Sequence, residues 1–154
     1  MNNSIKPIIF NLDDVKRKSE DGDKFACYIL DRSYDSEENG AEQSFEKAMY
    51  WYEKGKELGD PRYAYGVGAY YYFGFGNVER DENKAFELIH DCAMQGHIPA
   101  IYDLGANFYY NGVGTEKNLR LSEYYLKMAV NAGLPRAKVK FEQYKDTYES
   151  EIEK

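Results

Sequence analysis

The chain has 154 residues, 43% of them hydrophobic and 31% charged, which is the composition of one soluble globular domain. Its 27 acidic residues outnumber its 20 basic ones, and no dense Lys/Arg cluster occurs, so nucleic acid and anionic membranes are disfavoured as partners. The acidic balance suits a basic protein partner. No stretch resembles a signal peptide or a membrane span, so we expect a cytoplasmic protein.

The chain repeats itself with a period of 37 residues. Residues 1–21 are expected to form an N-terminal extension or cap, in which NLDDVKRKSED predicts a short helix. The period is then marked by Gly22, Gly59, Gly96 and Gly133. Further positions recur at the same spacing: Tyr28, Tyr65 and Tyr102; Leu30, Val67 and Leu104; Tyr34, Tyr71 and Phe108; Ala48, Ala85 and Ser122; Gly55, Cys92 and Ala129. Such a register predicts a repeat architecture.

Each copy has the pattern of two helices. Prolines follow the repeat glycines at Pro61, Pro99 and Pro135, where a helix begins readily. Apolar residues at three- and four-residue steps predict first helices over 62–73 and 100–110, then glycine-rich or polar loops, then second helices over 84–94 and 119–132. We therefore predict an all-α fold, a right-handed α-solenoid with repeats at 22–58, 59–95 and 96–132, closed by a C-terminal capping helix at 133–154, in a single domain.

These residues resemble the Sel1-like repeat, a relative of the tetratricopeptide repeat. The resemblance rests on a small helix-packing glycine, a G-x-G loop and a closing glycine: Gly68, Gly74-Phe75-Gly76 and Gly96 in the second copy, and Gly105, Gly112-Val113-Gly114 and Gly133 in the third, with one extra residue before Gly112. The first copy departs, because Asp31 stands at the packing-glycine position and DSEENGAEQ replaces the G-x-G loop.

The sequence offers no catalytic, cofactor-binding or metal-binding constellation. Cys27 and Cys92 are 65 residues apart and are expected in the core. His90 and His97 lack partners at a ligand or acid–base spacing, so we expect ordinary surface or junction residues. We do not expect an enzyme, a cofactor or a metal ion.

The surface of the first helices is then the candidate site. By analogy with the tetratricopeptide repeat, the residues on a concave face would be Tyr28, Arg32 and Asp35; Tyr65, Ala69, Tyr72 and Phe73; and Tyr102, Ala106, Tyr109 and Tyr110. Tyrosine is common at binding hot spots. Tyr28, Tyr65 and Tyr102 suit packing between repeats equally well, whereas Tyr71 and Phe108 are predicted to lie in the core.

We therefore expect a non-enzymatic adaptor or scaffold that binds a polypeptide partner on a tyrosine-rich face, and the acidic charge permits that partner to be basic. An alternative is a small acidic immunity or antitoxin-type protein that neutralises a toxin. The sequence leaves the partner, the face and the oligomeric state open.

Overall fold

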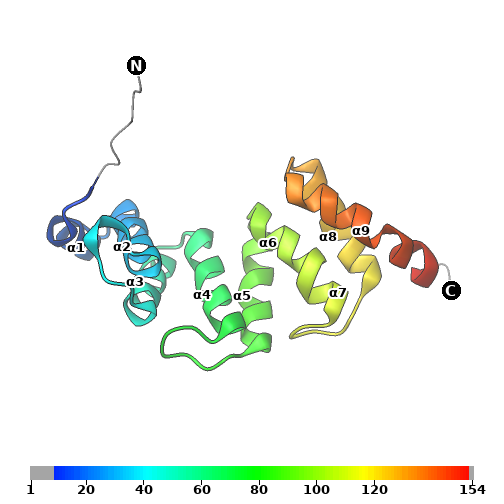
Figure 1. Cartoon of the computed structure of the whole chain (residues 1–154), viewed down its shortest axis with the longest axis horizontal. Coiled ribbons are helices and arrows are strands. Elements are labelled where there is room, and N and C mark those ends of the chain that lie inside the picture. Colours follow the sequence, from blue (N-terminus) through cyan, green and yellow to red (C-terminus); the bar gives the residue numbers. More distant parts are fainter. Residues whose placement is uncertain (1–8, 153–154) are drawn as a thin grey trace, which may run out of the picture. The chain divides into compact units, whose positions relative to one another are not determined.

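The computed structural model describes residues 9–152, and every regular element in that range is helical. Figure 1 shows the helices as a succession of hairpins along the chain. The chain divides into two compact units, one up to Asp60 and one from Pro61 onward. The predicted all-α solenoid class of fold is confirmed. Residues 1–8 of the predicted N-terminal extension lie outside the described residues.

Unit 1 contains α1 (Leu12–Glu20), α2 (Lys24–Ser36), the short 3₁₀ turn η1 (Glu38–Gly40) and α3 (Phe45–Glu57). Helix α1 occupies the segment in which a short helix was expected. Its side chain Val15 is buried, as are Leu30 on α2 and Trp51 on α3. The predicted hairpin of the first repeat therefore corresponds to α2 and α3.

Unit 2 contains two further hairpins and a long last helix. The first hairpin pairs α4 (Pro61–Phe73) with α5 (Glu82–Met94). The second pairs α6 (Ile98–Asp103), the π-helical turn η2 (Leu104–Phe108) and α7 (Tyr109–Asn111) with α8 (Leu119–Asn131). Helix α9 (Pro135–Ile152) packs against α8. The predicted first and second helices of both copies lie within these elements, to within two residues.

The second helix of each hairpin begins at a side-chain cap that recurs with the 37-residue period. Ser44, Asp81 and Asn118 each accept a hydrogen bond from the backbone N–H three residues later. Such caps satisfy one of the otherwise unpaired N–H groups in the first turn. They fix where α3, α5 and α8 start.

The repeat glycines end those helices in the left-handed conformation. At Gly96, φ is +82°, and the backbone N–H of the next residue, His97, bonds back to the carbonyl of Cys92 at 3.1 Å. Only glycine adopts this conformation without steric cost, which explains its recurrence at the end of each repeat.

Gly68 and Gly105 allow their helices to approach the partner helix of the hairpin closely. A Cβ on Gly68 would lie 2.9 Å from the end of the Ile89 side chain. A Cβ on Gly105 would lie 2.8 Å from the backbone nitrogen of Leu126 and 2.9 Å from the backbone oxygen of Ser122. The predicted role of both glycines in close helix packing is confirmed.

The extra residue of the third repeat is absorbed by the π turn η2, where the N–H of Tyr109 bonds to the carbonyl of Leu104, five residues earlier. The loops show the true register: the carbonyls of Tyr34, Tyr71 and Tyr109 accept equivalent hydrogen bonds from the N-cap residues of the following helices. The sequence period had instead aligned Phe108 with Tyr34 and Tyr71. The end of the first helix and the loop of the third repeat are therefore shifted by one residue after Gly105, and the 37-residue register resumes at the N-cap Asn118.

This shift changes which aromatic residues are buried. Phe108 is buried, as predicted, but Tyr109, which was predicted to face a partner, is also buried, because it occupies the core position of Tyr34. Tyr71 was predicted to lie in the core and is only half-buried. Its hydroxyl receives a hydrogen bond from Lys84 at 2.7 Å, so it lies at the border between core and solvent.

Both cysteines are fully buried, as predicted, and both are free thiols. Burial raises the pKa of the Cys92 thiol to about 11, and that of Cys27 is raised for the same reason. The Cys92 thiol donates a hydrogen bond to the carbonyl of Pro61 at 3.2 Å. These thiols therefore serve as small packing groups. Among the described helices, none is both long and apolar enough to cross a membrane.

Candidate functional site

A hollow of about 230 Å³ lies in unit 2 between residues of α4 and residues of α6 and η2. It is lined by Tyr65, Gly68, Ala69, Tyr72, Phe73, Ile89, Asp103, Asn107 and Phe108. Four predicted site residues, Tyr65, Ala69, Tyr72 and Phe73, are thus brought together in one place. We call this the α4–η2 hollow.

Asp103 supplies the only charge among the lining residues. One of its oxygens, Oδ2, accepts a hydrogen bond from the Tyr65 hydroxyl at 2.7 Å, and Oδ1 accepts one from the Asn107 amide at 3.2 Å. Tyr65 comes from α4, whereas Asp103 ends α6 and Asn107 lies about one turn later, in η2. The carboxylate is therefore held by both walls of the hollow.

Burial dominates the electrostatics of this pair. It raises the pKa of Asp103, even though the bond from Tyr65, the charge of Arg136 and the bond from Asn107 each act to lower it. The pKa of the Tyr65 hydroxyl is also raised, by burial first and then by the adjacent carboxylate. The charge of Asp103 is thus only partly compensated in the free protein. Such a group in a hollow is a functional-site candidate.

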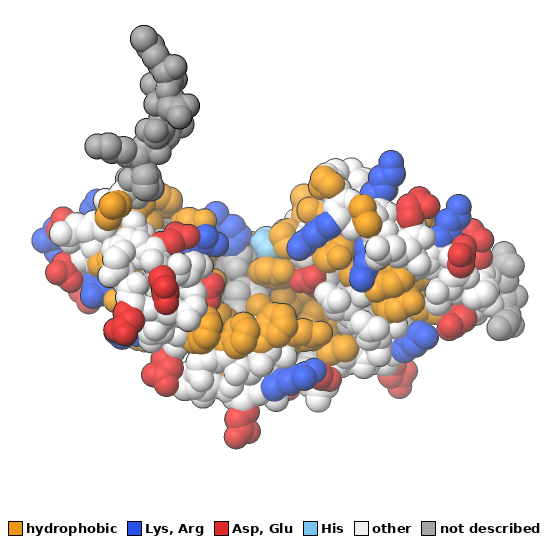
Figure 2. All heavy atoms as spheres, viewed as in Figure 1, with side chains coloured by type: hydrophobic (Ala, Val, Ile, Leu, Met, Phe, Trp, Pro, Cys, Tyr) orange, Lys and Arg blue, Asp and Glu red, His pale blue; other side chains and the backbone are white. Residues whose placement is uncertain are grey.

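Aromatic rings form the rest of the hollow and its edge. Tyr72 packs edge-to-face on Phe73, with ring centroids 4.9 Å apart, and on Phe108, with centroids 5.7 Å apart. Phe73 is 59% exposed and stacks on Phe75, which is 40% exposed. Figure 2 shows hydrophobic side chains gathered over the α4 and α5 region. An exposed aromatic edge beside a hollow is typical of a binding surface.

Two predicted site residues of the third repeat, Tyr102 and Tyr110, pack against helix α9. The Tyr110 ring stacks on that of Tyr144 in α9, with centroids 3.7 Å apart. The guanidinium of Arg136 lies 4.4 Å from the centroid of the Tyr102 ring. Tyr102 and Tyr110 are therefore partly covered by the chain's own last helix.

Two predicted site residues are internal. Ala106 is 1% exposed and belongs to a hydrophobic cluster with Leu126 and Tyr148. Tyr109 is 8% exposed and stacks on Tyr125, with ring centroids 5.5 Å apart. Their side chains offer little surface to a partner, because the π turn places them toward α8, and both are left out of the candidate site.

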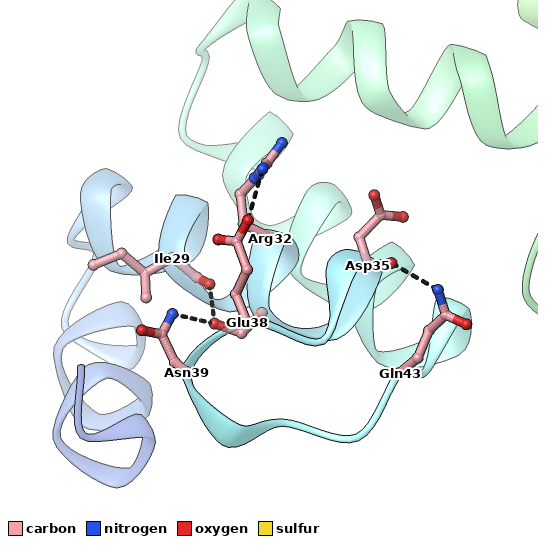
Figure 3. A network of polar contacts seen from close by, with 7 residues as sticks. Ile29, Arg32, Asp35, Glu38, Asn39 and Gln43 are labelled. Carbon is pink, nitrogen blue, oxygen red and sulfur yellow. Dashed lines mark hydrogen bonds and ion pairs between the residues drawn. The ribbon is translucent and has the colours of Figure 1, made fainter. Parts of the chain in front are cut away.

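The remaining predicted residues lie in unit 1. Tyr28 is 46% exposed and stacks on Phe25. Arg32 forms an ion pair with Glu38 of η1 at 2.8 Å, and Asp35 accepts a hydrogen bond through its backbone carbonyl from Gln43 (Figure 3). These contacts tie the irregular loop after α2 to the helix, so Arg32 has a structural contact of its own.

The sequence did not single out Asp103, Asn107, Ile89 and Phe108 as lining residues of a site. One signal for Asp103 and Asn107 was present: two polar residues lie four apart, and thus on one helical face, within an otherwise apolar segment. His97, expected at a junction, precedes α6, and its ring lies 4.8 Å from that of Tyr65. Within residues 9–152, no group of three or more His, Cys, Asp or Glu side chains is placed to hold a metal ion.

The family is shown by three matches to the Sel1 repeat, at residues 34–60, 61–97 and 98–134. These cover more than half of the chain, so the chain belongs to the Sel1 repeat family, and the resemblance seen in the sequence is confirmed. The first match begins only at residue 34, which agrees with the divergence of the first copy. Proteins of this family are generally non-catalytic adaptors for protein–protein interaction.

Solved structures of Sel1-like repeat proteins share the fold. A Sel1 repeat protein from Oxalobacter formigenes is 31% identical, with a TM-score of 0.73, over 86% of this chain and 97% of that one. The protective antigen c5321 of uropathogenic Escherichia coli is 24% identical, with a TM-score of 0.74, over 82% of this chain and 26% of that one. Cysteine rich protein B of Helicobacter pylori is 21% identical, with a TM-score of 0.63, over 82% and 91%.

A curated relative is chitin synthase regulatory factor 1 of Schizosaccharomyces pombe. It is 35% identical over 85 residues, which are 54% of this chain and 18% of that protein. The chain therefore spans less than a fifth of the length of this relative.

Proposed function

We propose that the chain is a non-enzymatic adaptor that binds a polypeptide partner on the surface around the α4–η2 hollow. The observation that carries the proposal is the convergence of Tyr65, Ala69, Tyr72 and Phe73 on one hollow with an exposed aromatic edge. The proposal keeps this part of the predicted tyrosine-rich face and omits Ala106 and Tyr109.

The chemistry of the surface suits a polypeptide. Rigid aromatic side chains lose little conformational entropy on binding and provide large contact areas, and such residues dominate the energetics of protein interfaces. Phe73 and Phe75 already stack on each other in the free protein, so their edge is preorganised. The Sel1 repeat family, in which protein interaction is the general role, supports the same class of partner.

The net charge of −7 favours a basic partner. In this proposal the two proteins meet in the cytoplasm. The charge also favours the second candidate, an immunity-type protein that neutralises a basic toxin. The two roles differ in the identity of the partner: a toxin in one case, a component of a larger assembly or a regulated enzyme in the other. The S. pombe relative, named as a regulatory factor, supports the adaptor role.

Site-specific photo-crosslinking tests the proposal. A photoreactive benzophenone amino acid replaces Phe73. Because Phe73 is 59% exposed, the additional benzoyl ring can project into solvent without disturbing the fold. On irradiation in the native host, we expect a covalent adduct with a polypeptide, identified by mass spectrometry.

The matched control places the same amino acid at Tyr124 of α8, which is 56% exposed but is not a lining residue of the hollow. Crosslinking at position 73 and not at position 124 would support the proposal. Equal crosslinking at both positions, or none at position 73, would contradict it.

A further inference from the structure

We propose that the α4–η2 hollow holds a lysine or arginine side chain of the polypeptide partner, with Asp103 as its counter-ion and the rings of Tyr72, Phe73 and Phe108 around its stem. This inference rests on the proposed function and specifies its chemistry. It assigns the recognition of one cationic side chain to a particular cluster in unit 2.

The Asp103 carboxylate has unused capacity to accept hydrogen bonds. An ionised carboxylate offers about four acceptor sites, and Tyr65 and Asn107 occupy two of them. Because burial raises the pKa of Asp103, its charge is incompletely stabilised in the free protein. A bound ammonium or guanidinium group would supply the missing compensation through charge-assisted hydrogen bonds.

The aromatic walls favour the same ligand. A cation within about 6 Å of a ring centroid is attracted by the negative face of the ring. The aliphatic stem of lysine or arginine packs well on apolar side chains while its charged head reaches a polar group. In the hollow, Ile89 and Phe108 provide the apolar contact and Asp103 the polar end.

The volume of the hollow sets the size of the ligand. About 230 Å³ is smaller than the roughly 300–1,000 Å³ of pockets that enclose whole small-molecule ligands. It suits one side chain that enters from an attached polypeptide. The hollow is also far larger than the ~30 Å³ share of one water molecule, so it is more than a packing defect.

Two arginines lie near the hollow, and neither lines it. Arg136 contacts the Tyr102 ring, and its charge acts on Asp103. The Arg80 guanidinium lies 5.8 Å from the centroid of the Tyr72 ring and is paired with Glu82. Arg136 therefore competes electrostatically with a bound cation, and its removal should strengthen binding of that cation.

The experiment is an NMR titration of the full chain with blocked single amino acids. The probes are Nα-acetyl-lysine N-methylamide and Nα-acetyl-arginine N-methylamide, and the norleucine analogue supplies the same kind of stem without charge. We expect shifts of the Asn107 side-chain amide and the Ala69 and Ile89 methyl groups, with a Kd on the order of 1 to 10 mM for so small a ligand.

Three variants decide the role of the charge. Asp103→Asn keeps the shape and an acceptor for Tyr65, and should weaken binding of the cationic probes by at least about tenfold. Asp146→Asn removes the same charge from an exposed position on α9 and should leave binding unchanged. Arg136→Gln should tighten binding by about two- to threefold, as expected when one like charge near the surface is removed. Tighter binding of the cationic probes by Arg136→Gln could not result from misfolding of that variant.

Three results would overturn the inference. The norleucine probe could bind as tightly as the cationic probes, or Asp103→Asn could bind the cationic probes at full affinity. The cationic probes could also cause no chemical-shift changes at concentrations well above the expected Kd. The crosslinking at Phe73 reports on the proposed function separately. A polypeptide adduct at position 73 together with absent cation binding would leave the proposed function standing and reject only the cationic ligand.

Discussion

The hydroxyl of Ser122 on α8 donates a hydrogen bond to the backbone carbonyl of Gly105 in the π turn, at 2.7 Å, with both residues buried. The same hydroxyl lies 2.9 Å from the Tyr148 hydroxyl of α9. The equivalent residues of the earlier repeats are Ala48 and Ala85, which are also fully buried. The serine hydroxyl thus links α8 to η2 and α9. The other repeats have alanine at this position, where only a small side chain is required.

Replacing Ser122 with alanine should lower the stability of unit 2 by about 1–3 kcal/mol, because the Gly105 carbonyl and the Tyr148 hydroxyl lose a buried partner. Native-state hydrogen exchange of the α8 amides measures this local free energy of opening. Ser150→Ala, at an exposed position on α9, is the control and should change it by less than about 0.5 kcal/mol. Equal protection in both variants would show that the buried network contributes nothing.

The two packing glycines should differ in their tolerance of alanine. At Gly105 an added Cβ meets backbone atoms of α8, which have little room to move, whereas at Gly68 it meets mainly the flexible end of Ile89. Alanine gains about 1 kcal/mol of helix propensity over glycine in both cases, and overpacking costs about 1–3 kcal/mol. Denaturant titration should therefore find Gly105→Ala the less stable variant, by at least about 1 kcal/mol. The reverse order would contradict the close approach at Gly105.

The hairpins could be predicted from the sequence because their signals are local. Glycines such as Gly96 end helices through their own φ, and the loops before α5 and α8 carry their own turn residues. The 37-residue period then located equivalent residues without any knowledge of tertiary contacts. Features that are encoded within a few neighbouring residues can therefore be predicted from the sequence.

The candidate site was only partly predictable, for two physical reasons. The 37-residue period assumes the same number of residues per helical turn in every repeat, whereas the π turn accommodates one extra residue. Tyr109 was therefore expected on the surface, but it is buried. The pairing of Tyr65 with Asp103, 38 residues later, depends on how α4 is placed relative to α6 of the following hairpin. Likewise, the stacking of Tyr110 on Tyr144 depends on where α9 docks, and no local pattern encodes this.

Tyr110 should act as a packing residue and Phe73 as a surface residue. Tyr110→Ala removes a ring stacked at 3.7 Å on Tyr144 and should destabilise unit 2 by about 2 kcal/mol or more. Phe73→Ala, at a 59% exposed position, should change stability by less than about 1 kcal/mol. Thermal unfolding followed by circular dichroism measures both. A larger loss for Phe73→Ala would place that ring in the core instead.

The charge of Asp103 should destabilise the folded chain at neutral pH. Burial raises the pKa of Asp103 in the folded chain above its unfolded value of about 3.9. The contribution of this carboxyl group to the free energy of unfolding is therefore fully present below about pH 3.9 and is lost as the pH rises through the folded pKa. The free energy of unfolding of Asp103→Asn, minus that of the parent, should therefore be more positive at pH 7 than at pH 3. Urea unfolding of both proteins at both pH values measures this difference. A difference of opposite sign would show that the partners of Asp103 outweigh its burial; Asp146→Asn is the matched control.

Cys27 and Cys92 should be inert in the folded protein. Both are fully buried, and the pKa of Cys92 is raised to about 11, so little thiolate is present or accessible at pH 8. Alkylation by iodoacetamide, followed by mass spectrometry, should label both residues in urea and neither in buffer over the same time. Rapid labelling of either thiol in buffer would contradict the packing of its helix.

The affinity of the crosslinked polypeptide for surface variants tests the central claim most directly. The double variant Tyr72→Ser/Phe73→Ser removes the aromatic edge of the α4–η2 hollow, whereas Tyr124→Ser removes a ring elsewhere on unit 2 that is 56% exposed, close to the 59% of Phe73. Isothermal titration calorimetry should show at least a roughly hundredfold loss of affinity for the double variant and less than about a twofold change for the control, since hot-spot residues carry most of the binding energy. Full affinity of a folded double variant would contradict the assignment of the binding surface.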